Sequence, residues 1–444
     1  MTSFVSTRGR APVLEFDDVL LEGLARDGGL YVPDAIGKLP GDLPAGYVEL
    51  AAAITGIEHD VLVEAYATFD HPDVCPVLQL DDDFWVQELW HGPTLAFKDV
   101  ALQLVGRLMD AELERRGERR TIVVATSGDT GSAAIAACVG RANLDIVVLH
   151  PAGRVSDVQR KQMTTVDEPN VHNVAIEGTF DDCQDLVKAM FADEVFRDQM
   201  QLGAMNSINW GRVLAQIPYY VSGQLAVGHP CTFAVPTGNF GNALAGWYAR
   251  KMGTPIERFI IGANTNDILA RWVASGALVT EVVVPTWSPS MDIQVSSNLE
   301  RLLFELLDRD GARTADLMVR FREIGSVEAP RDPSFAAARI DDRETLDVIR
   351  NVHERYGYLI DPHTAVGVGA ARKARRDGER IVCLSTAHPA KFPDAVRKAT
   401  GVEPEIPERL AAALEGEERY ERLANDLALV KGYVSANSSA KLRE

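Results

Sequence analysis

From about residue 120 onward, short apolar runs rich in β-branched residues alternate with helix-like segments. Of all the features of the sequence, this alternation restricts the possible folds most. TIVVAT (121–126) precedes the small-residue segment GSAAIAACVG (131–140), and DIVVLHP (145–151) follows it. Continuously apolar strands are typical of parallel sheets that helices cover on both faces. Further runs of this kind occupy 171–178, 231–238, 258–264 and 380–386. The sequence therefore predicts an α/β fold with parallel sheets.

The 444 residues are too many for one average domain. Residues 1–85 carry turn signals and helical stretches near 16–26 and 46–68, which predict a cap domain. Residues 86–400 are expected to form the α/β region, and 401–444 a helical extension whose last thirty residues are one charged helix and a tail.

Charge and composition exclude several classes of function. The formal net charge of −19 argues against nucleic acid, because phosphate backbones are bound by basic surfaces. No apolar run is long enough to cross a bilayer, and the N-terminus lacks a signal-peptide layout, so we expect a cytoplasmic protein that does not associate with membranes. The five cysteines include no CxxC pair, which predicts buried free thiols and no metal site.

The segment GPTLAFKDVALQ (92–103) places Lys98 at the start of an apolar helical pattern. Apolar neighbours can desolvate a lysine and lower its pKa, as covalent amine catalysis requires. The alternative is a solvated lysine at a helix start, paired with Asp99.

Two glycine-containing turns follow predicted strands and open helices. TSGDTGSA (126–133) offers Ser127, Thr130 and backbone N–H groups to an anion at a helix N-terminus, although a capped tight turn is the alternative. TGNFGN (237–242) repeats this arrangement with two glycines three residues apart, so that the backbone can approach a phosphate closely. Neither turn has the spacing of a dinucleotide or Walker motif.

Cations in two helical segments are candidates for binding a substrate phosphate. Arg212 lies in an otherwise apolar helix with Asn209 on the same turn, and a buried guanidinium needs an anionic partner. Arg160 and Lys161 are the other candidates, with ordinary helix-surface charge as the alternative.

The segment STAHPAKFP (385–393) ends the last predicted strand. Thr386 is placed where the carboxyl ends of strands line the ligand crevice of an open sheet. His388 and Lys391 suggest a hydrolase triad, but no serine elbow accompanies them.

Taken together, these segments resemble the threonine synthases of the longer bacterial and fungal type. The resemblance extends from STRG (6–9) and GLARDGGLYVP (23–33) to about residue 400. The segments that carry it are GPTLAFKDVALQ, TSGDTGSA, SINWGR (207–212), PTGNFGN (236–242), PSMDIQVSSNLERLLFE (289–305) and STAHPAKF (385–392). It implies an enzyme of fold type II dependent on pyridoxal 5′-phosphate (PLP), similar to tryptophan synthase β, with an N-terminal cap domain and the cofactor between two sub-domains.

The resemblance also implies roles for individual residues. Lys98 matches the lysine that links covalently to PLP, Asp129 matches the loop that faces the ring hydroxyl, and Thr386 matches the hydroxyl at the pyridine nitrogen. The phosphate of PLP is expected in a cup formed by Gly238, Asn239, Phe240, Gly241 and Asn242. For the substrate's carboxylate and phosphate we select Ser127, Thr130, Arg160, Lys161, Asn209 and Arg212.

The implied reaction converts O-phospho-L-homoserine and water into L-threonine and phosphate, in a monomer or homodimer. Three alternatives stay open: a related PLP enzyme such as threonine dehydratase or a β-replacement enzyme, a Rossmann oxidoreductase, and a non-catalytic paralogue. The related enzyme would not need a second anion site. The glycine spacing counts against the oxidoreductase, and the intact AFKD lysine counts against the paralogue.

Overall fold

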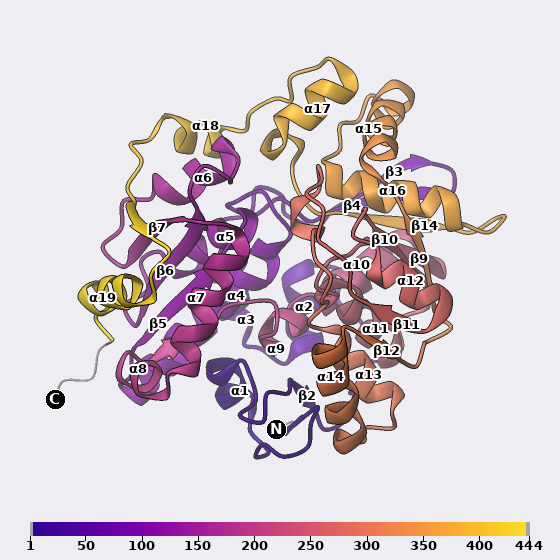
Figure 1. Cartoon of the computed structure of the whole chain (residues 1–444). Helices are drawn as coiled ribbons and strands as arrows, with labels where there is room; N and C mark the ends of the chain where they lie inside the picture. Colours follow the sequence, from indigo (N-terminus) through magenta and orange to yellow (C-terminus); the bar gives the residue numbers. More distant parts are fainter. Residues whose placement is uncertain (1–2, 441–444) are drawn as a thin grey trace.

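Two open sheets, each with helices on both faces, form two lobes in the computed structural model, which describes residues 3–440 (Figure 1). The first lobe contains a five-stranded sheet in the order β15-β7-β6-β5-β8, with every neighbouring pair parallel. Its strands are β5 (Arg120–Ala125), β6 (Leu144–Pro151), β7 (Val171–Glu177), β8 (Leu202–Gly203) and β15 (Glu421–Ala424). Apolar side chains of α4 (Lys98–Arg116) and α5 (Asp129–Cys138) cover one face, and those of α7 (Phe180–Ala192) and α19 (Leu427–Asn437) cover the other.

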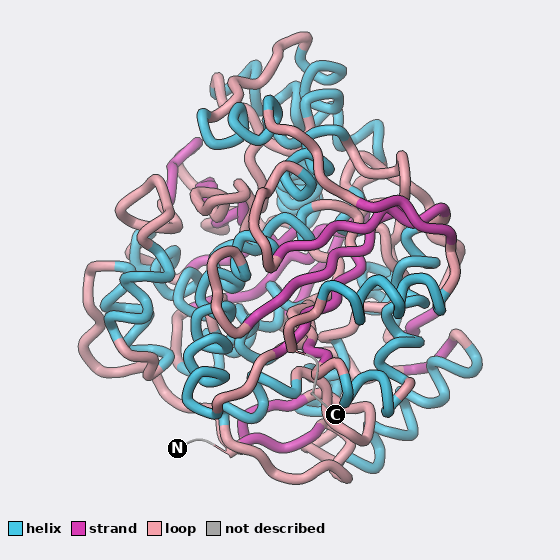
Figure 2. The backbone as a smooth tube through the Cα atoms, turned by 90° about the vertical axis from the view of Figure 1, so that its left-hand side faces the viewer, coloured by secondary structure: helices cyan, strands magenta, loops and turns pink. Residues whose placement is uncertain are grey.

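The second lobe contains a six-stranded sheet in the order β13-β10-β9-β14-β4-β3, parallel except for the β3–β4 pair. Its strands are β3 (Val77–Asp81), β4 (Phe84–Glu88), β9 (Cys231–Pro236), β10 (Ile256–Ala263), β13 (Phe335–Arg339) and β14 (Ile381–Ser385). One face packs on α15 (Asp342–Tyr356) and α16 (Pro362–Ala374), and the other packs on α10 (Ile217–Val227), α11 (Gly241–Met252) and α12 (Ile268–Ser275). Figure 2 shows strands enclosed between helices.

These sheets confirm the predicted α/β architecture. Each of the apolar runs singled out in the sequence forms a parallel strand, because both of its faces are buried against helices. Thr179 caps α7 as part of a capping box with Asp182, which satisfies backbone N–H groups at the helix start.

Further elements connect and flank the two sheets: helices, turns of 3-10 helix and a two-stranded ribbon. They are α6 (Asp157–Thr164), α8 (Glu194–Gln199), α9 (Trp210–Leu214), α13 (Leu299–Leu306), α14 (Gly311–Ile324), α17 (Pro393–Thr400), η1 (Pro289–Met291), η2 (Pro389–Lys391), β11 (Ala277–Val279) and β12 (Ser326–Glu328).

The N-terminal segment contains the predicted helices with one interruption. The stretch predicted over 46–68 is two helices, α2 (Tyr47–Thr55) and α3 (His59–Tyr66), because Gly56 adopts a left-handed conformation with φ of 72°. The segment also holds α1 (Phe16–Glu22) and a ribbon of β1 (Phe4–Ser6) and β2 (Tyr31–Pro33). The boundary drawn at residue 85 falls inside β4, which belongs to the second sheet.

A buried ion pair attaches the N-terminus to α13. The Arg8 guanidinium donates to both carboxylate oxygens of Glu300 at 3.0 Å, and the Thr7 hydroxyl donates to the same carboxylate at 2.8 Å. The adjacent Arg301 donates to the carbonyl of Tyr31 at 2.9 Å. Two segments that carried the family resemblance, STRG and SSNLER, therefore contact each other across the fold.

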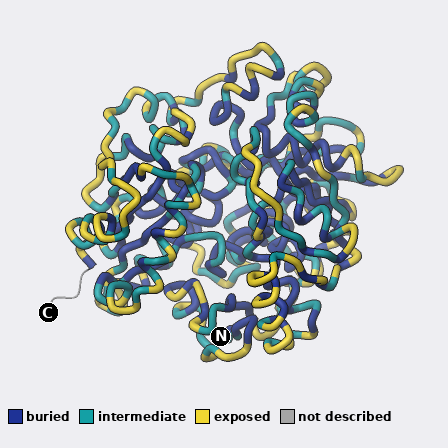
Figure 3. Tube along the Cα trace, viewed as in Figure 1, coloured by how far each residue is buried: buried dark blue, intermediate teal, exposed yellow. Residues whose placement is uncertain are grey.

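The sequence predicts a single charged helix followed by a tail for the C-terminal segment, but the structure differs. After α17 in the second lobe, the chain crosses to the first lobe, where α18 (Glu408–Glu415) packs on α6 (Figure 1). It then forms β15, which pairs in parallel with β7, and ends in α19. The prediction missed β15 because three of its four residues are exposed and its sequence, ERLA, lacks the apolar pattern of a strand. Figure 3 shows this segment mostly on the surface, around buried strands.

The five cysteines are all buried and free, as predicted. Among the described residues, no helix has the length and apolar character that a membrane span requires.

Candidate active site

The carboxyl ends of strands from both lobes lead into the turns that the sequence singled out. β5 leads into the turn at 126–131, β9 into the turn at 237–242, and β14 ends immediately before Thr386. The loop before α4 contacts the end of β14, because the backbone N–H of Phe97 donates to the carbonyl of Thr386 at 2.8 Å. Lys98 is therefore positioned at the strand ends, where ligands of open α/β sheets bind.

Lys98 is the first residue of α4 and is only 7% exposed. Burial lowers the pKa of its ammonium group, Asp129 opposes this effect, and the charges of Lys391 and Arg212 reinforce it. The alternative of a solvated lysine paired with Asp99 is wrong. The Asp99 carboxylate instead accepts hydrogen bonds from the backbone N–H and hydroxyl of Thr94, at 2.7 and 2.8 Å. Lys98 thus has the buried setting of a reactive amine.

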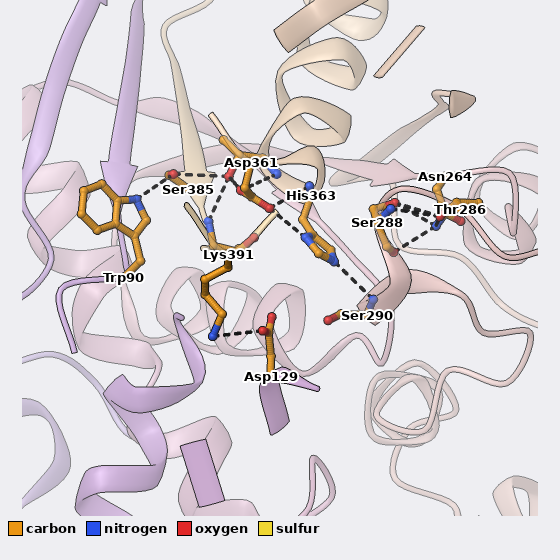
Figure 4. Close-up of polar contacts among 12 residues, drawn as sticks. Trp90, Asp129, Asn264, Thr286, Ser288, Ser290, Asp361, His363, Ser385 and Lys391 are labelled. Atoms are coloured by element: carbon orange, nitrogen blue, oxygen red, sulfur yellow. Dashed lines mark hydrogen bonds and ion pairs between the residues drawn. The ribbon is translucent and has the colours of Figure 1, made fainter. Parts of the chain in front are cut away.

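The Asp129 carboxylate is shared by two lysines. One oxygen lies 3.4 Å from Lys98 Nζ, and the other lies 3.1 Å from Lys391 Nζ and accepts from Gln159 Nε2 at 2.9 Å. Burial alone would raise the pKa of Asp129, but the ammonium groups of Lys391 and Lys98 hold it well below its ordinary value. Figure 4 shows Lys391 and Asp129 facing each other from opposite segments.

The turn at 237–242 leaves several donors free for an anion. Within the described residues, the backbone N–H groups of Asn239 to Asn242 have no hydrogen-bond acceptor, as expected for the first turn of a helix. Phe240, the residue before α11, has a φ of 62°, which turns the backbone sharply into the helix. A Cβ on Gly238 would lie 2.8 Å from the carbonyl oxygen of Ser290, so glycine is required for this close approach. The helix N-terminus and its free donors fit a phosphate group.

Asn242, in the same turn, has an unpartnered buried amide nitrogen. Its oxygen accepts hydrogen bonds from the hydroxyls of Tyr219 and Tyr220 at 2.6 and 2.7 Å, which fixes the orientation of the amide. The buried Nδ2 then has no partner among the described residues. A donor in this position fits a bound anion better than an apolar ligand.

Thr386 is held by its backbone while its side chain stays free. Its N–H donates to Thr364 Oγ1 at 3.1 Å, and its hydroxyl makes no hydrogen bond to any described residue. The side chain is thus placed at the strand end with an unused donor.

The six candidate substrate-binding residues fall into four groups, the last of which is Arg160 with Lys161. Arg212 is 4% exposed, its Nε is unpartnered within the described residues, and burial lowers its pKa to about 10. Ser127 and Thr130 are partly exposed at the turn beside Asp129. Asn209 is occupied as the cap of α9, because its amide accepts from the N–H of Gly211 and donates to the carbonyl of Leu20.

Arg160 and Lys161 are bonded to the C-terminal segment. The Arg160 guanidinium donates to both carboxylate oxygens of Glu418, at 2.8 and 3.0 Å, and Lys161 Nζ donates to the carbonyl of Leu414 at 2.5 Å. The structure therefore places Arg212 close enough to Lys98 for its charge to lower the pKa of that lysine, whereas Arg160 and Lys161 have protein partners in the C-terminal segment.

Sequence reasoning missed Lys391 as part of this site. The signal was a lysine in the apolar segment after a strand end, which the sequence analysis considered only for a hydrolase triad. The neighbouring His388 is not joined to a serine nucleophile in any contact among the described residues. Its imidazole instead packs edge-on against Trp90, and burial lowers its pKa to about 4.

The residues of this site fit the chemical groups of PLP. The buried lysine of lowered pKa is the amine that an aldehyde requires. The glycine-containing helix N-terminus offers free N–H groups to a phosphate, and the strand-end hydroxyl can donate to a pyridine nitrogen. The fold and site define a PLP-dependent enzyme of fold type II.

Comparison with known proteins specifies the family. The family described as "Pyridoxal-phosphate dependent enzyme" matches residues 75–387, "Threonine synthase N terminus" matches 3–57, and "Threonine synthase, C-terminal" matches 364–434. The chain is 48% identical to a threonine synthase of Pseudomonas aeruginosa, with 98% of each chain covered. The structure of PLP-bound threonine synthase from Brucella melitensis is 49% identical, with a TM-score of 0.94 over 99% of this chain and 100% of that one. Yeast threonine synthase matches with 36% identity and a TM-score of 0.91 over 98% of each chain. The chain belongs to the threonine synthase family.

Proposed function

We propose that the chain converts O-phospho-L-homoserine and water into L-threonine and inorganic phosphate with PLP as its cofactor. The observation that carries this proposal is Arg212, a buried guanidinium without an acidic partner among the described residues, beside Lys98. An unpaired buried charge is costly, so the position is suited to a ligand anion. A second anion site besides the cup for the cofactor phosphate distinguishes this reaction from that of related enzymes acting on serine or threonine.

Each group of residues has its own role in the proposed reaction. The N–H groups of Asn239 to Asn242 would hold the cofactor phosphate, and the hydroxyl of Thr386 would contact the pyridine nitrogen. When bound, PLP supplies an electron sink for carbanions at the substrate. Lys98, whose lowered pKa favours the neutral amine, takes the proton from Cα and moves protons at Cβ and Cγ. Arg212 holds the substrate phosphate as it leaves Cγ, and Ser127 and Thr130 bind the carboxylate.

We place three candidates outside the substrate site, because their polar groups already have protein partners. The amide of Asn209 is occupied at both ends by backbone groups, and Glu418 neutralises Arg160. Lys161 donates to a backbone carbonyl of the C-terminal segment. We therefore assign the substrate phosphate to Arg212 alone among the predicted cations.

We also propose a three-part organisation and a cellular setting. The N-terminal unit and the C-terminal extension flank the catalytic region, and the N-terminal unit is attached to it by the Arg8–Glu300 pair. Five buried free thiols support a cytoplasmic location, because reducing compartments keep cysteines unpaired.

Steady-state assays with alternative substrates test the reaction itself. We expect release of inorganic phosphate and formation of threonine in equal amounts from O-phosphohomoserine, and far slower turnover of threonine or serine. Preferred turnover of serine or threonine without phosphate release would assign the chain to a related PLP enzyme instead.

Replacing Thr386 with valine tests the proposed contact with the ring nitrogen. Valine preserves the shape of threonine but removes the hydroxyl, which makes no hydrogen bond to any described residue. If the lost bond contributes about 1–2 kcal/mol in the transition state, kcat falls roughly fivefold to thirtyfold. Thr400→Val, at the end of α17, is the matched control. An unchanged rate, visible spectrum and ratio of threonine to 2-oxobutyrate would show that Thr386 does not contact the ring.

A further inference from the structure

Lys391 is a second lysine in the site and has no assigned role. It ends η2, and its side chain is completely buried, with 0% exposure. Its Nζ donates to the carbonyl of Thr94 at 2.6 Å and lies 3.1 Å from Asp129 Oδ1 (Figure 4). A buried ammonium group is retained only where an anion compensates for its lost hydration, and Asp129 is that anion.

The charges around Lys98 are unequal. Lys98, Lys391 and Arg212 provide three cations, whereas Asp129 is, among the described residues, the carboxylate that forms an ion pair with both lysines. Burial raises the pKa of Asp99 to about 6, and its carboxylate accepts hydrogen bonds from Thr94 instead of pairing with either lysine. Asp129 is therefore shared between two ammonium groups, and Arg212 adds a third positive charge nearby.

His363 is a further titratable group that faces Asp129, and it has a carboxylate partner of its own. Its Nε2 accepts the backbone N–H of Ser290 at 3.2 Å, and its Nδ1 lies 2.7 Å from the carboxylate of Asp361. The cations that lower the pKa of Lys98 are Lys391 and Arg212.

We propose that Lys391 is a positioning residue that binds Asp129 from the side opposite Lys98 and thereby keeps Lys98 from holding a proton. In its absence Asp129 would pair with Lys98 alone, and this ion pair would favour the charged amine. The inference rests on the proposed function, because it takes Lys98 as the reactive amine. A purely structural lysine would instead serve only to satisfy the carbonyl of Thr94.

Neutral and charged replacements of Lys391 separate these two roles. Lys391→Gln removes the charge but can still donate to the Thr94 carbonyl, and Lys391→Arg keeps the charge. Lys391→Met is a second neutral variant that buries no unpaired polar group, and Gln162 still donates to the Thr94 carbonyl at 3.2 Å. Lys188→Met, an exposed lysine on α7, is the control. Thermal unfolding identifies the variants that fold.

The measurement is a pH titration of the visible absorbance of the PLP-loaded full chain, which reports protonation of the Lys98 nitrogen. We expect Lys391→Gln and Lys391→Met to raise its apparent pKa by roughly one unit, within the range that a neighbouring charge produces. Lys391→Arg and Lys188→Met should leave it at the parent value. The pH profile of kcat/KM should move in the same direction as the absorbance.

A folded neutral variant whose apparent pKa equals that of the parent overturns the inference, as does an equal shift in Lys391→Arg. Either result leaves the proposed function intact if the parent still forms threonine from O-phosphohomoserine. Failure of the proposed function would appear separately, as a parent protein that forms neither threonine nor phosphate from O-phosphohomoserine.

Discussion

Lys98→Ala is expected to abolish threonine formation and to remove the visible absorbance of the resting enzyme. Only a primary amine can link to the aldehyde of PLP, and Lys98 is the buried amine whose lowered pKa suits that reaction. Lys391 is also a buried amine in this site, but its amino group is already engaged by the Thr94 carbonyl and by Asp129. Alanine therefore removes a function that no neighbouring side chain replaces.

Borohydride reduction followed by peptide mapping gives an independent measurement. We expect the reduced cofactor on the peptide that contains Lys98 in the parent protein, and on no peptide in the variant. Lys188→Ala is the control for loss of an exposed lysine. Normal turnover of Lys98→Ala, or a labelled peptide centred on Lys391, would require a different assignment.

Arg212→Ala is expected to lower kcat/KM for O-phosphohomoserine by about 2–5 kcal/mol of transition-state binding, or roughly thirtyfold to several thousandfold. The reason is that Arg212 has no acidic partner among the described residues, so its charge is available to the leaving phosphate. PLP content should stay unchanged, because the proposed donors to the cofactor phosphate are backbone N–H groups of 239–242, which the substitution leaves in place. Arg320→Ala, an exposed arginine on α14, is the control.

Stability measurements distinguish a ligand-binding arginine from a structural one. Removal of an unpaired buried charge should not lower the free energy of unfolding of the ligand-free protein, because the cost of burying that charge disappears. Inorganic phosphate should raise the melting temperature of the parent more than that of the variant, since ligand bound only to the folded state stabilises it. Equal activity of variant and parent would move the phosphate site away from Arg212.

Local sequence carried most of the information about the strands and their turns. Strands such as β6 were predictable because they are apolar on both faces, and the turn at 237–242 because glycine and a helix start are local properties. Lys98 was identified for the same reason, from the apolar residues beside it.

Contacts between distant segments could not be derived in this way. The environment of Lys391 depends on how η2 of one lobe packs against α5 of the other. Arg160 looked available for substrate because its partner, Glu418, lies in the C-terminal segment, which was predicted as a charged helix without a contact to the rest of the protein. Asn209 was selected by its proximity to Arg212 along the chain, whereas its amide caps a helix.

The parallel pairing of β15 with β7 has a consequence for biosynthesis of the chain. The first lobe is built mainly from residues made early, yet one edge of its sheet is supplied by residues 421–424. Until these residues leave the ribosome, the backbone groups of β7 on that side have no partner strand, and Arg160 lacks Glu418. An unpaired edge can join the strand of another molecule. The nascent protein therefore carries an aggregation-prone edge until β15 has been made and pairs with β7.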